Sequence, residues 1–512
     1  MKKILLSTAV IVTVSMAGGE FTSFENSDVT FANNDTTLSE IEALKARIVA
    51  LEGTQSKADA PAPASADADL AKKIKKLEKK LKKMKKTLNK VKAHDAYDNI
   101  KFNMDFRSTV DNINYKYNDY KYKGKDWSGA EAKNDSLFTS RLMLNMMSKP
   151  TDNLSFQGQL AAYYTWGAHL FESHDAPLKG WAGSSKASDT IFRVRRAYFV
   201  YNNSDDFYAF SIGRRQASDG FLANHRENNP EPASPLAHIT NMEVDAAMVK
   251  LKTDNLVTGS FVKFVYGRAH AGGIESFYDG AGYKPYAQED GDVDENVDFF
   301  VTVASLYNDG QYNLMGQHAM IFNTKGARTG EPLGKPLADG TGKNKSLDAG
   351  TAHLTALSLQ VDGIGDEISD FLDDTVAFAS VARSMYDPDS GHQLIGSDKE
   401  TRGYSAWVGL VVPDMITDKG RFGLEYNYGT QFWTPMTWAE DSAIGSKLAV
   451  RGSAIEAYWN FNLMGEKNLP AQIRYTHAQH DYTPNIRCTG WVAPKEVDIE
   501  ADDIRLSVSY RY

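Results

Sequence analysis

The chain has 512 residues, a formal net charge of −9 and a mean hydropathy of −0.44. This polar average excludes a bundle of transmembrane helices, and a lone cysteine, Cys488, excludes an intramolecular disulfide framework. The 39 glycines and 25 tyrosines are typical of a chain with many short strands and turns.

The first residues have the pattern of a secretory signal peptide. Lys2 and Lys3 precede an apolar run from Ile4 to Val14, and Ser15 and Ala17 then place small residues at positions −3 and −1 of a cleavage site. A membrane anchor needs about 18–20 apolar residues, and this run is shorter. We therefore expect residues 1–17 to be removed on export and residues 18–35 to be disordered.

Two segments with heptad spacing come next. Residues 36–53 predict a short helix, residues 54–69 form a linker rich in Ala and Pro, and residues 70–93 predict a Lys-rich coiled coil. The coiled-coil seam consists of Leu70, Ile74, Leu77, Leu81, Met84, Leu88 and Val91. Twelve lysines and one acid, Glu78, surround this seam. The segment is either a self-associating stalk or a solvated spacer that packs on residues 36–53, and Lys72–Lys92 suits peptidoglycan or another anionic surface.

The end of the chain alternates strictly between apolar and polar residues. Ile504, Leu506, Val508, Tyr510 and Tyr512 alternate with Arg505, Ser507, Ser509 and Arg511. A period of two describes a strand with lipid on one side and water on the other, and the final aromatic residue resembles the C-terminal signal of outer-membrane proteins. A soluble sandwich can use the same alternation, but it gives no reason for the chain to stop on a tyrosine.

The same pattern recurs through residues 98–512. We expect an all-β transmembrane barrel of about 16 antiparallel strands, preceded by the short α-helical coiled-coil segment. Links after even-numbered strands are short and links after odd-numbered strands are long, which places turns in the periplasm and loops outside. The expected strands lie at 100–110, 137–148, 153–166, 190–202, 206–215, 243–253, 256–267, 296–308, 312–324, 351–362, 374–387, 402–412, 420–433, 449–462, 469–481 and 502–512.

The third long loop runs from Arg214 to Asn241. In general porins the corresponding loop folds into the lumen and narrows it, so we expect a constriction here. If Phe192, Val194, Tyr198 and Val200 of the preceding strand face lipid, its arginines face the lumen, because an arginine on the lipid face costs about 2–4 kcal/mol at mid-depth. The candidate pore-lining residues are Arg193, Arg195, Arg215, Asp219, His225, Arg226 and Glu227.

Two interpretations of these arginines remain compatible. Facing the loop carboxylates across a narrow lumen, they would create a transverse field that orients dipolar solutes and favours anions. Alternatively, they are structural and attach the carboxylates of the loop to the barrel wall.

Three stretches carry a family resemblance. Arg193 to Tyr201, the strand end Ile212-Gly213-Arg214-Arg215 and the loop from Gly220 to Asn228 resemble an uncharacterised porin-like family of Gram-negative bacteria. The resemblance covers nearly the whole chain, and members of the family share the signal peptide, the N-terminal heptads and the barrel. It implies the fold and no known substrate.

Two further features carry weaker hypotheses. Asp290, Asp292 and Asp294 cluster oxygen ligands that suit Ca²⁺, but Val301 stands where a calcium-binding hand has its twelfth-position Glu, and a solvated acidic loop is the alternative. Cys488, beside Trp491, is expected to be a free thiol.

These observations predict an outer-membrane porin-type channel for passive diffusion of small polar or charged solutes, possessing no cofactor and no enzyme activity. The expected partners are solutes, outer-membrane lipid and a homotrimer, with no nucleic acid. Alternatives are a barrel sheath for an electron conduit, a cell-wall tether, or an outer-membrane hydrolase using residues such as His477 and His480. The chain has no Cys-x-x-Cys-His motif, so any haem in a conduit would belong to a partner.

Overall fold

The computed structural model describes residues 100–512 except 123, 169–189, 230–231, 272–295, 331–346, 366–367, 418, 438–440 and 485–492. The chain divides into two units, residues 1–92 with Tyr512, and Ala93–Arg511. The second unit holds every element described below. The expected signal peptide, the helix at 36–53, the linker and the coiled coil at 70–93 lie outside the described residues.

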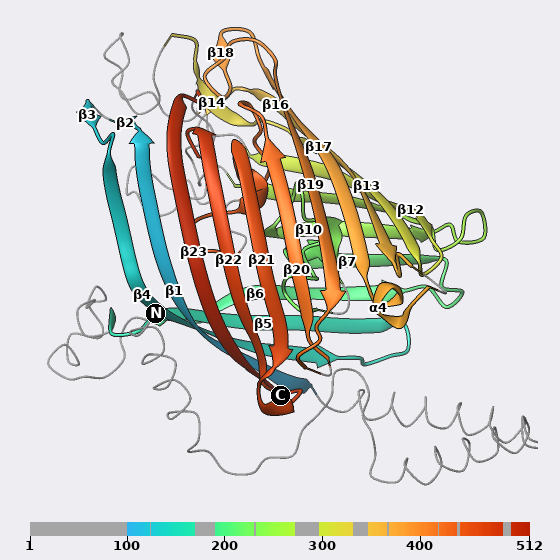
Figure 1. Ribbon diagram of the computed structural model, residues 1–512. Coiled ribbons are helices and arrows are strands. Elements are labelled where there is room, and N and C mark those ends of the chain that lie inside the picture. The colour runs from blue at the N-terminus through green and yellow to red at the C-terminus, as the bar shows by residue number, and fades with distance from the viewer. Residues whose placement is uncertain are drawn as a thin grey trace, which may run out of the picture. The chain divides into compact units, whose positions relative to one another are not determined.

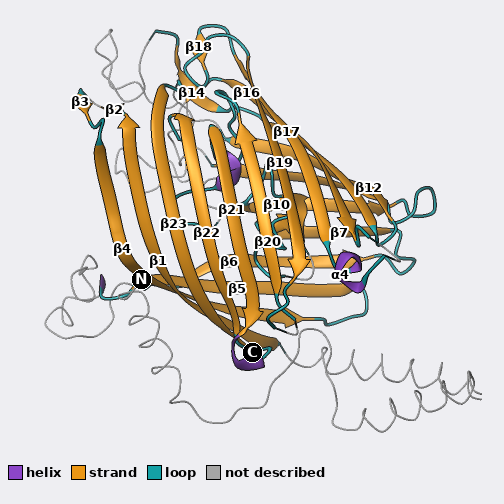
Figure 2. Ribbon diagram, in the orientation of Figure 1, coloured by secondary structure: helices purple, strands orange, loops and turns teal. Residues whose placement is uncertain are grey.

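Sixteen of the described strands form a closed antiparallel barrel (Figure 1, Figure 2). Each strand pairs with its neighbours in chain order, and the first strand pairs with the last to close the cylinder. The barrel strands are β1 (Lys101–Asp119), β4 (Ala130–Ser148), β5 (Leu154–Thr165), β6 (Arg193–Asn202), β7 (Tyr208–Ala217), β10 (Met242–Lys252), β11 (Phe261–His270), β12 (Val297–Asn308), β13 (Tyr312–Ile321), β16 (Gly350–Asp362), β17 (Val376–Pro388), β19 (Thr401–Pro413), β20 (Arg421–Gly429), β21 (Gly452–Asn462), β22 (Pro470–Tyr482) and β23 (Glu496–Arg511).

Short elements lie in the links between barrel strands. They are β2 (Lys121–Tyr122), β3 (Lys125–Asp126), β8 (Gly220–Phe221), β9 (Ala233–Leu236), β14 (Lys325–Arg328), β15 (Leu347–Asp348), β18 (His392–Gln393), helix α4 (Asp370–Asp373) and the 3-10 turns η4 (Lys447–Ala449) and η5 (Leu463–Gly465). β14 pairs with both β15 and β18, so two long loops are joined beyond the barrel rim. Helix α4 lies between β16 and β17, where a short turn was expected.

The expected barrel of sixteen antiparallel strands is confirmed, and each expected stretch overlaps one barrel strand. The main differences are at the ends. β1 continues to Asp119, beyond the expected residue 110, β4 begins at Ala130 rather than at 137, and β23 begins at Glu496 rather than at 502. These extensions carry charged residues, and Lys116 Nζ lies 3.2 Å from Glu500 Oε2. Ladder hydrogen bonds and ion pairs hold them together, so the apolar alternation that revealed the other strands is weak there.

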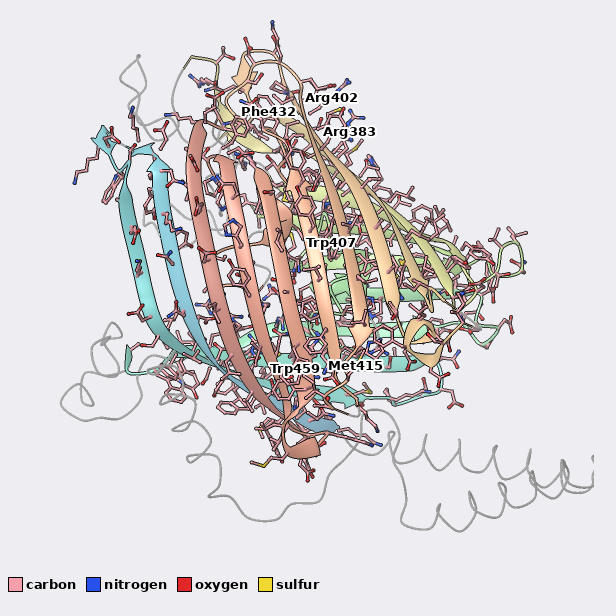
Figure 3. The ribbon with its side chains drawn as sticks, viewed as in Figure 1. Arg383, Arg402, Trp407, Met415, Phe432 and Trp459 are labelled. Carbon is pink, nitrogen blue, oxygen red and sulfur yellow. The ribbon has the colours of Figure 1, made fainter. Side chains whose placement is uncertain are left out.

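The wall has an apolar outer face. In β19 the side chains of Tyr404, Val408 and Leu410 are 50%, 47% and 41% exposed, whereas Trp407 on the opposite face is fully buried. Trp407 lies midway along the wall, and Trp459 lies at the turn end near Met415 (Figure 3). On the outer face Trp459 stacks with Phe422 and Phe461, at ring distances of 5.5 and 4.3 Å. An apolar band ending in aromatic residues is typical of barrels that span a membrane.

The largest buried apolar cluster lies inside the barrel. It joins inner-face wall residues such as Leu354, Phe378 and Trp407 to residues from long loops such as Phe221 and Trp433. The lumen is therefore partly packed by chain that enters from the loop side.

Candidate functional site

The third loop, residues 218–241 between β7 and β10, enters the lumen. At its tip the carbonyl of His225 accepts a hydrogen bond from Asn460 Nδ2 at 3.1 Å, and the carbonyl of Arg226 accepts one from Gln472 Nε2 at 2.6 Å. His225 Nε2 lies 2.9 Å from Gln360 Oε1. Asn460, Gln472 and Gln360 are each within two residues of the turn end of their strands. The loop therefore reaches through most of the depth of the barrel.

The return arm of the third loop is attached to the wall through His238. Its Nδ1 lies 2.8 Å from Ser380 Oγ in β17, and its Nε2 lies 2.8 Å from Ser405 Oγ in β19. The ring is fully buried and meets Trp407 and Trp433 edge-on at 5.8 and 5.6 Å. Burial lowers the pKa of His238 to about 3, so the imidazole is neutral here and forms one donating and one accepting bond with the two hydroxyls.

A second loop also enters the lumen, and the sequence did not predict it. In this seventh loop, residues 430–451 between β20 and β21, Trp433 is fully buried and its Nε1 donates to the carbonyl of Leu448 at 2.7 Å. Arg451 Nε donates to the carbonyl of Trp433 at 2.9 Å. A signal was present, because Trp433, Ile444, Leu448 and Val450 form an apolar set that a solvated loop has no reason to carry.

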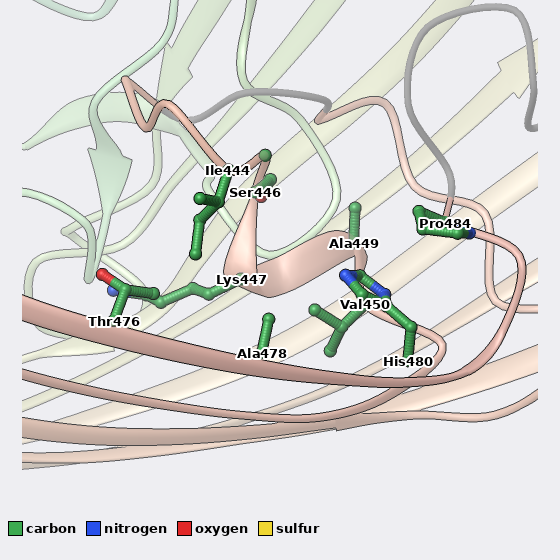
Figure 4. A pocket seen from close by; sticks show the side chains of 10 residues that line it. Ile444, Ser446, Lys447, Ala449, Val450, Thr476, Ala478, His480 and Pro484 are labelled. Carbon is green, nitrogen blue, oxygen red and sulfur yellow. The ribbon is translucent and has the colours of Figure 1, made fainter. Parts of the chain in front are cut away.

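Lys447 of the seventh loop anchors it to the wall by charge. Its ammonium lies 2.7 Å from Glu425 in β20 and also pairs with Glu456 in β21, and all three side chains are at least 98% buried. Behind this loop, η4 faces Thr476, Ala478 and His480 of β22 (Figure 4). The cavity left between them is about 10 Å³, room for no more than one water, so solute does not pass there.

The arginine-rich strand β6 has a different register from the one expected. Val194 pairs with Leu160, but the next paired residue is Arg196 opposite Gln159, so Arg195 occupies a bulge. Phe192 and Val194 are exposed as expected. Beyond the bulge the faces are reversed, and Tyr198 turns inward, its hydroxyl donating to Gln157 Oε1 at 2.6 Å. Placing Tyr198 and Val200 on the lipid face was therefore wrong, because a bulge shifts the period by one residue.

The candidate arginines of β6 and β7 are placed as follows. Arg193 pairs with Ala161 on the inner face of β5. The guanidinium of Arg195 is 15% exposed, pairs with Glu243, donates to Ser218 Oγ at 2.9 Å and lies 3.5 Å from Gln159 Oε1. Arg215 lies over the ring of Tyr198, 4.7 Å from its centroid.

The candidate residues of the third loop do not form one row. Asp219 Oδ2 accepts from Gln216 Nε2 at 2.8 Å, and burial raises its pKa, assisted by the charge of Glu227. Glu227 lies 2.6 Å from Arg226 of its own loop. Arg226 is 1% exposed and 3.8 Å from Glu456. Arg226, paired with Glu227, thus attaches the loop tip to the wall, and His225 stacks on Phe378 with ring centroids 5.8 Å apart.

One sector of the lumen is left uncovered by the two loops. Inner-face residues of β16 to β22, such as Leu354, Ser380 and Asn427, are buried. By contrast, inner-face Arg196, Arg215, Lys250 and Lys263 of β6 to β11 keep partial exposure. Lys250 and Lys263 share the ring of Phe261, at 4.4 and 4.8 Å from its centroid. The uncovered wall therefore carries a group of basic side chains on four neighbouring strands, β6, β7, β10 and β11.

Residues 131–508 match the model of a family described as a protein of unknown function, DUF3373. The chain belongs to this family. The match begins in β4 and ends in β23, so the DUF3373 region includes both loops that enter the lumen. It confirms the family resemblance seen in the sequence. No curated protein matches the chain.

Solved structures are similar to the DUF3373 barrel at low sequence identity. The outer-membrane channel DcaP of Acinetobacter baumannii is 15% identical, with a TM-score of 0.42 over 81% of this chain and 97% of that one. OprB of Pseudomonas putida is 12% identical, with a TM-score of 0.41 over 81% and 94%. An anion-selective porin from Comamonas acidovorans is 12% identical, with a TM-score of 0.44 over 81% and 100%.

Two of the expected features are not described by the structure. The calcium candidates Asp290, Asp292 and Asp294, and also Cys488, lie outside the described residues. Within the described part of the chain, no three His, Cys, Asp or Glu side chains are grouped so that they could hold a metal ion. In that same part, no helix is long and apolar enough to cross a membrane.

Proposed function

We propose that this DUF3373 protein is an outer-membrane channel of the porin type for passive diffusion of small polar or charged solutes. The observation that carries the proposal is a closed sixteen-stranded barrel that is apolar outside and holds charged and hydroxyl side chains inside. Closure leaves no unpaired edge in hydrocarbon, and a lumen of this size and polarity holds water. Lipid and solutes are then its immediate partners.

The solute path follows the uncovered sector of the lumen. The third and seventh loops pack mainly against β12 to β22, and Asp441 of the seventh loop also reaches Arg107 of β1 and Arg141 of β4. The path for solutes then lies between these loops and the inner faces of β1, β4 to β7, β10 and β11. The third loop narrows this path together with the seventh. Arg193, Arg195 and Arg215 act on the wall side, and Asp219 faces them from the third loop.

The charge of the path favours anions. Arg196, Arg215, Lys250 and Lys263 line it. The acids near the loop tip are already engaged, Glu227 of the third loop with Arg226 and Glu456 of β21 with Lys447. A positive wall in a narrow, weakly screened lumen raises the local anion concentration.

Planar-bilayer recording of the purified protein tests this function. We expect discrete conductance steps in KCl and, in a KCl gradient, a reversal potential of the sign that chloride permeation gives. A protein that inserts as a heat-modifiable barrel without conducting would contradict a channel function. Conduction with a cation-type reversal potential would contradict only the assigned selectivity.

The sheath and hydrolase alternatives receive less support. Two loops packed in the lumen occupy the space that an enclosed partner would need. His477 lies on the outer face of β22, where its Nδ1 is 2.9 Å from Asp502, whereas His480 lies on the inner face opposite Gly452. The two histidines therefore do not serve one catalytic site.

For the N-terminal segment we propose a periplasmic location and binding of peptidoglycan through Lys72–Lys92. Twelve lysines against one acid supply the charge for an anionic surface, and the chain enters β1 at the turn end of the barrel. Co-sedimentation of the full chain with purified peptidoglycan sacculi tests this binding. The experiment is done with and without about 0.5 M NaCl, because salt at this concentration screens surface charge. Analytical ultracentrifugation in detergent tests the expected trimer.

A further inference from the structure

A cavity of about 340 Å³ opens on the inner face of β1, β4 and β5, beside the seventh loop. Its lining includes three arginines, Arg107, Arg141 and Arg505, together with the hydroxyls of Thr109 and Thr139 and the ring of Tyr163. The volume lies within the range of small-molecule sites, about 300–1,000 Å³. The cavity belongs to the uncovered sector, so a solute in transit reaches it.

One carboxylate already occupies the centre of this arginine cluster. Asp441 of the seventh loop receives hydrogen bonds from both terminal nitrogens of Arg107, at 2.5 Å to Oδ2 and 2.7 Å to Oδ1. Arg141 Nη1 lies 3.6 Å from the same Oδ2. Arg505 Nη1 donates to the main-chain carbonyl of Asp441 at 2.6 Å.

The remaining charges show that the site has room for one carboxylate. Arg505 pairs with Asp111 at 2.5 Å, and Arg141 lies 3.4 Å from Asp105. Both of these acids belong to the wall strand β1, whereas Asp441 comes from a loop. If Asp441 moves away, Arg107 loses the carboxylate to which it is hydrogen-bonded. The Nε atoms of Arg107 and Arg141 are also buried without a hydrogen-bond partner, so the cluster keeps unused donors.

Asp441 is held in an unfavourable backbone conformation. Its φ is +54°, in the left-handed region that residues other than Gly rarely adopt. Burial opposes its ionisation, but the charges and hydrogen bonds of Arg107, with Arg141 and Arg505, outweigh this and hold the pKa of Asp441 well below its usual value. The arginine cluster thus holds the carboxylate of Asp441 at some conformational cost to the seventh loop. This cost favours replacing the carboxylate of Asp441 by that of a free solute.

We propose that this cavity is a binding site for small organic carboxylates, in which the solute carboxylate replaces that of Asp441 on Arg107 and Arg141. The rest of the solute then lies against Tyr163 and the hydroxyls of Thr109 and Thr139. The planar fork of Arg107 already holds a carboxylate through two parallel bonds, a geometry that chloride cannot reproduce. This inference rests on the proposed channel function and names its solute class.

Block of the chloride current by added anions tests the site. Single-channel conductance in KCl is titrated with succinate and benzoate, and separately with inorganic phosphate. In the wild type we expect saturable block by both carboxylates and weaker block by phosphate. Arg107→Lys keeps the charge and removes the fork, and it should raise the half-blocking carboxylate concentration about tenfold or more, the equivalent of one charge-assisted hydrogen bond.

Asp441→Asn removes the internal competitor without changing its size. It should lower the half-blocking carboxylate concentration about tenfold. The matched control is Asp245→Asn, because Asp245 forms an equally bidentate pair with Arg214 on the exposed outer face, at 2.8 Å for both bonds. Asp245→Asn and Arg214→Lys should leave the block unchanged.

The outcomes separate the two proposals. Absence of any KCl conductance overturns the channel function itself. Conductance without carboxylate block, equal block by phosphate, or an Asp441→Asn variant with larger conductance and unchanged block overturns only the carboxylate site. Heat-modifiable migration on gels shows whether each barrel has closed, and Arg141→Lys provides a second reduced-affinity variant if Asp441→Asn does not fold.

Discussion

Thr240 of the third loop and Met436 of the seventh loop are paired in a parallel β-bridge. The amide of Asn241 donates to the carbonyl of Met436, and the amide of Met436 donates to the carbonyl of Ile239, both at 3.0 Å. The two loops that enter the lumen are therefore joined to each other as well as to the wall. Displacing one should disturb the other.

Gly403 tests this connection. A Cβ on Gly403 would lie 2.3 Å from the amide nitrogen of Trp433 and 2.4 Å from the carbonyl of Phe432. Because these are backbone atoms, Gly403→Ala should push the seventh loop away from β19, widen the path and destabilise the protein by about 1–3 kcal/mol. We expect a higher single-channel conductance and a lower urea midpoint.

Gly316→Ala is the matched control for this substitution. The nearest atoms to its Cβ would lie 3.8 Å away, an ordinary contact distance, so conductance and midpoint should stay at wild-type values. If the two alanine variants have the same conductance and the same urea midpoint, close packing at Gly403 does not position the seventh loop.

His238 should make the docking of the third loop sensitive to acid. The docked histidine has a pKa of about 3, and a released one has about 6.5. Below pH 6.5 the released loop binds a proton that the docked loop excludes. Docking is therefore fully favoured above that pH and weakens by about 1.4 kcal/mol per pH unit between 6.5 and 3. Conductance and current noise should rise as the pH falls from 7 to 4.

His238→Asn isolates this effect because an amide does not titrate in that range. Its current should respond less to pH than that of the wild type. An identical pH response in both proteins would assign the acid sensitivity to other groups, such as Asp219.

The uncovered arginine wall should set ion selectivity. Replacing Arg196 and Arg215 together by Gln removes two positive charges from the path while keeping polar side chains. Since fixed charge sets the local counter-ion concentration, we expect the reversal potential in a KCl gradient to move toward zero. Arg268→Gln, which removes a charge paired with Asp298 near the exposed rim, should not move it.

Lys447 should be important for stability. Lys447→Met leaves Glu425 and Glu456 buried in the lumen without their shared ammonium. Breaking a buried ion pair from one side costs about 3–5 kcal/mol. The urea midpoint should fall accordingly, and adding Glu425→Gln should restore part of the loss. A Lys447→Met variant as stable as the wild type would show that water solvates the carboxylates of Glu425 and Glu456 in place of the ammonium.

The sequence alone determined the wall of this protein. Strands such as β19 and β23 were predictable because residues that face lipid are mostly apolar and those that face the lumen are mostly polar or small. The alternation of short and long links predicted which end of each strand carries a turn and which a loop. The third loop was expected in the lumen from its resemblance to porins. The extent of β1, β4 and β23 was underestimated, because their outer ends are stabilised by ladder bonds and ion pairs rather than by an apolar face.

Only the tertiary structure decided the interior. Arg107 and Asp441 are 334 residues apart, and no local pattern marks them as partners. The bulge at Arg195 reverses the faces of β6 because one extra residue shifts a period of two, and the sequence does not show where that residue is inserted. Whether a long loop turns outward or into the lumen depends on the contacts that the lumen offers it. The seventh loop, for example, finds Glu425 and Glu456 there as partners for Lys447. Those contacts exist only after the barrel has closed.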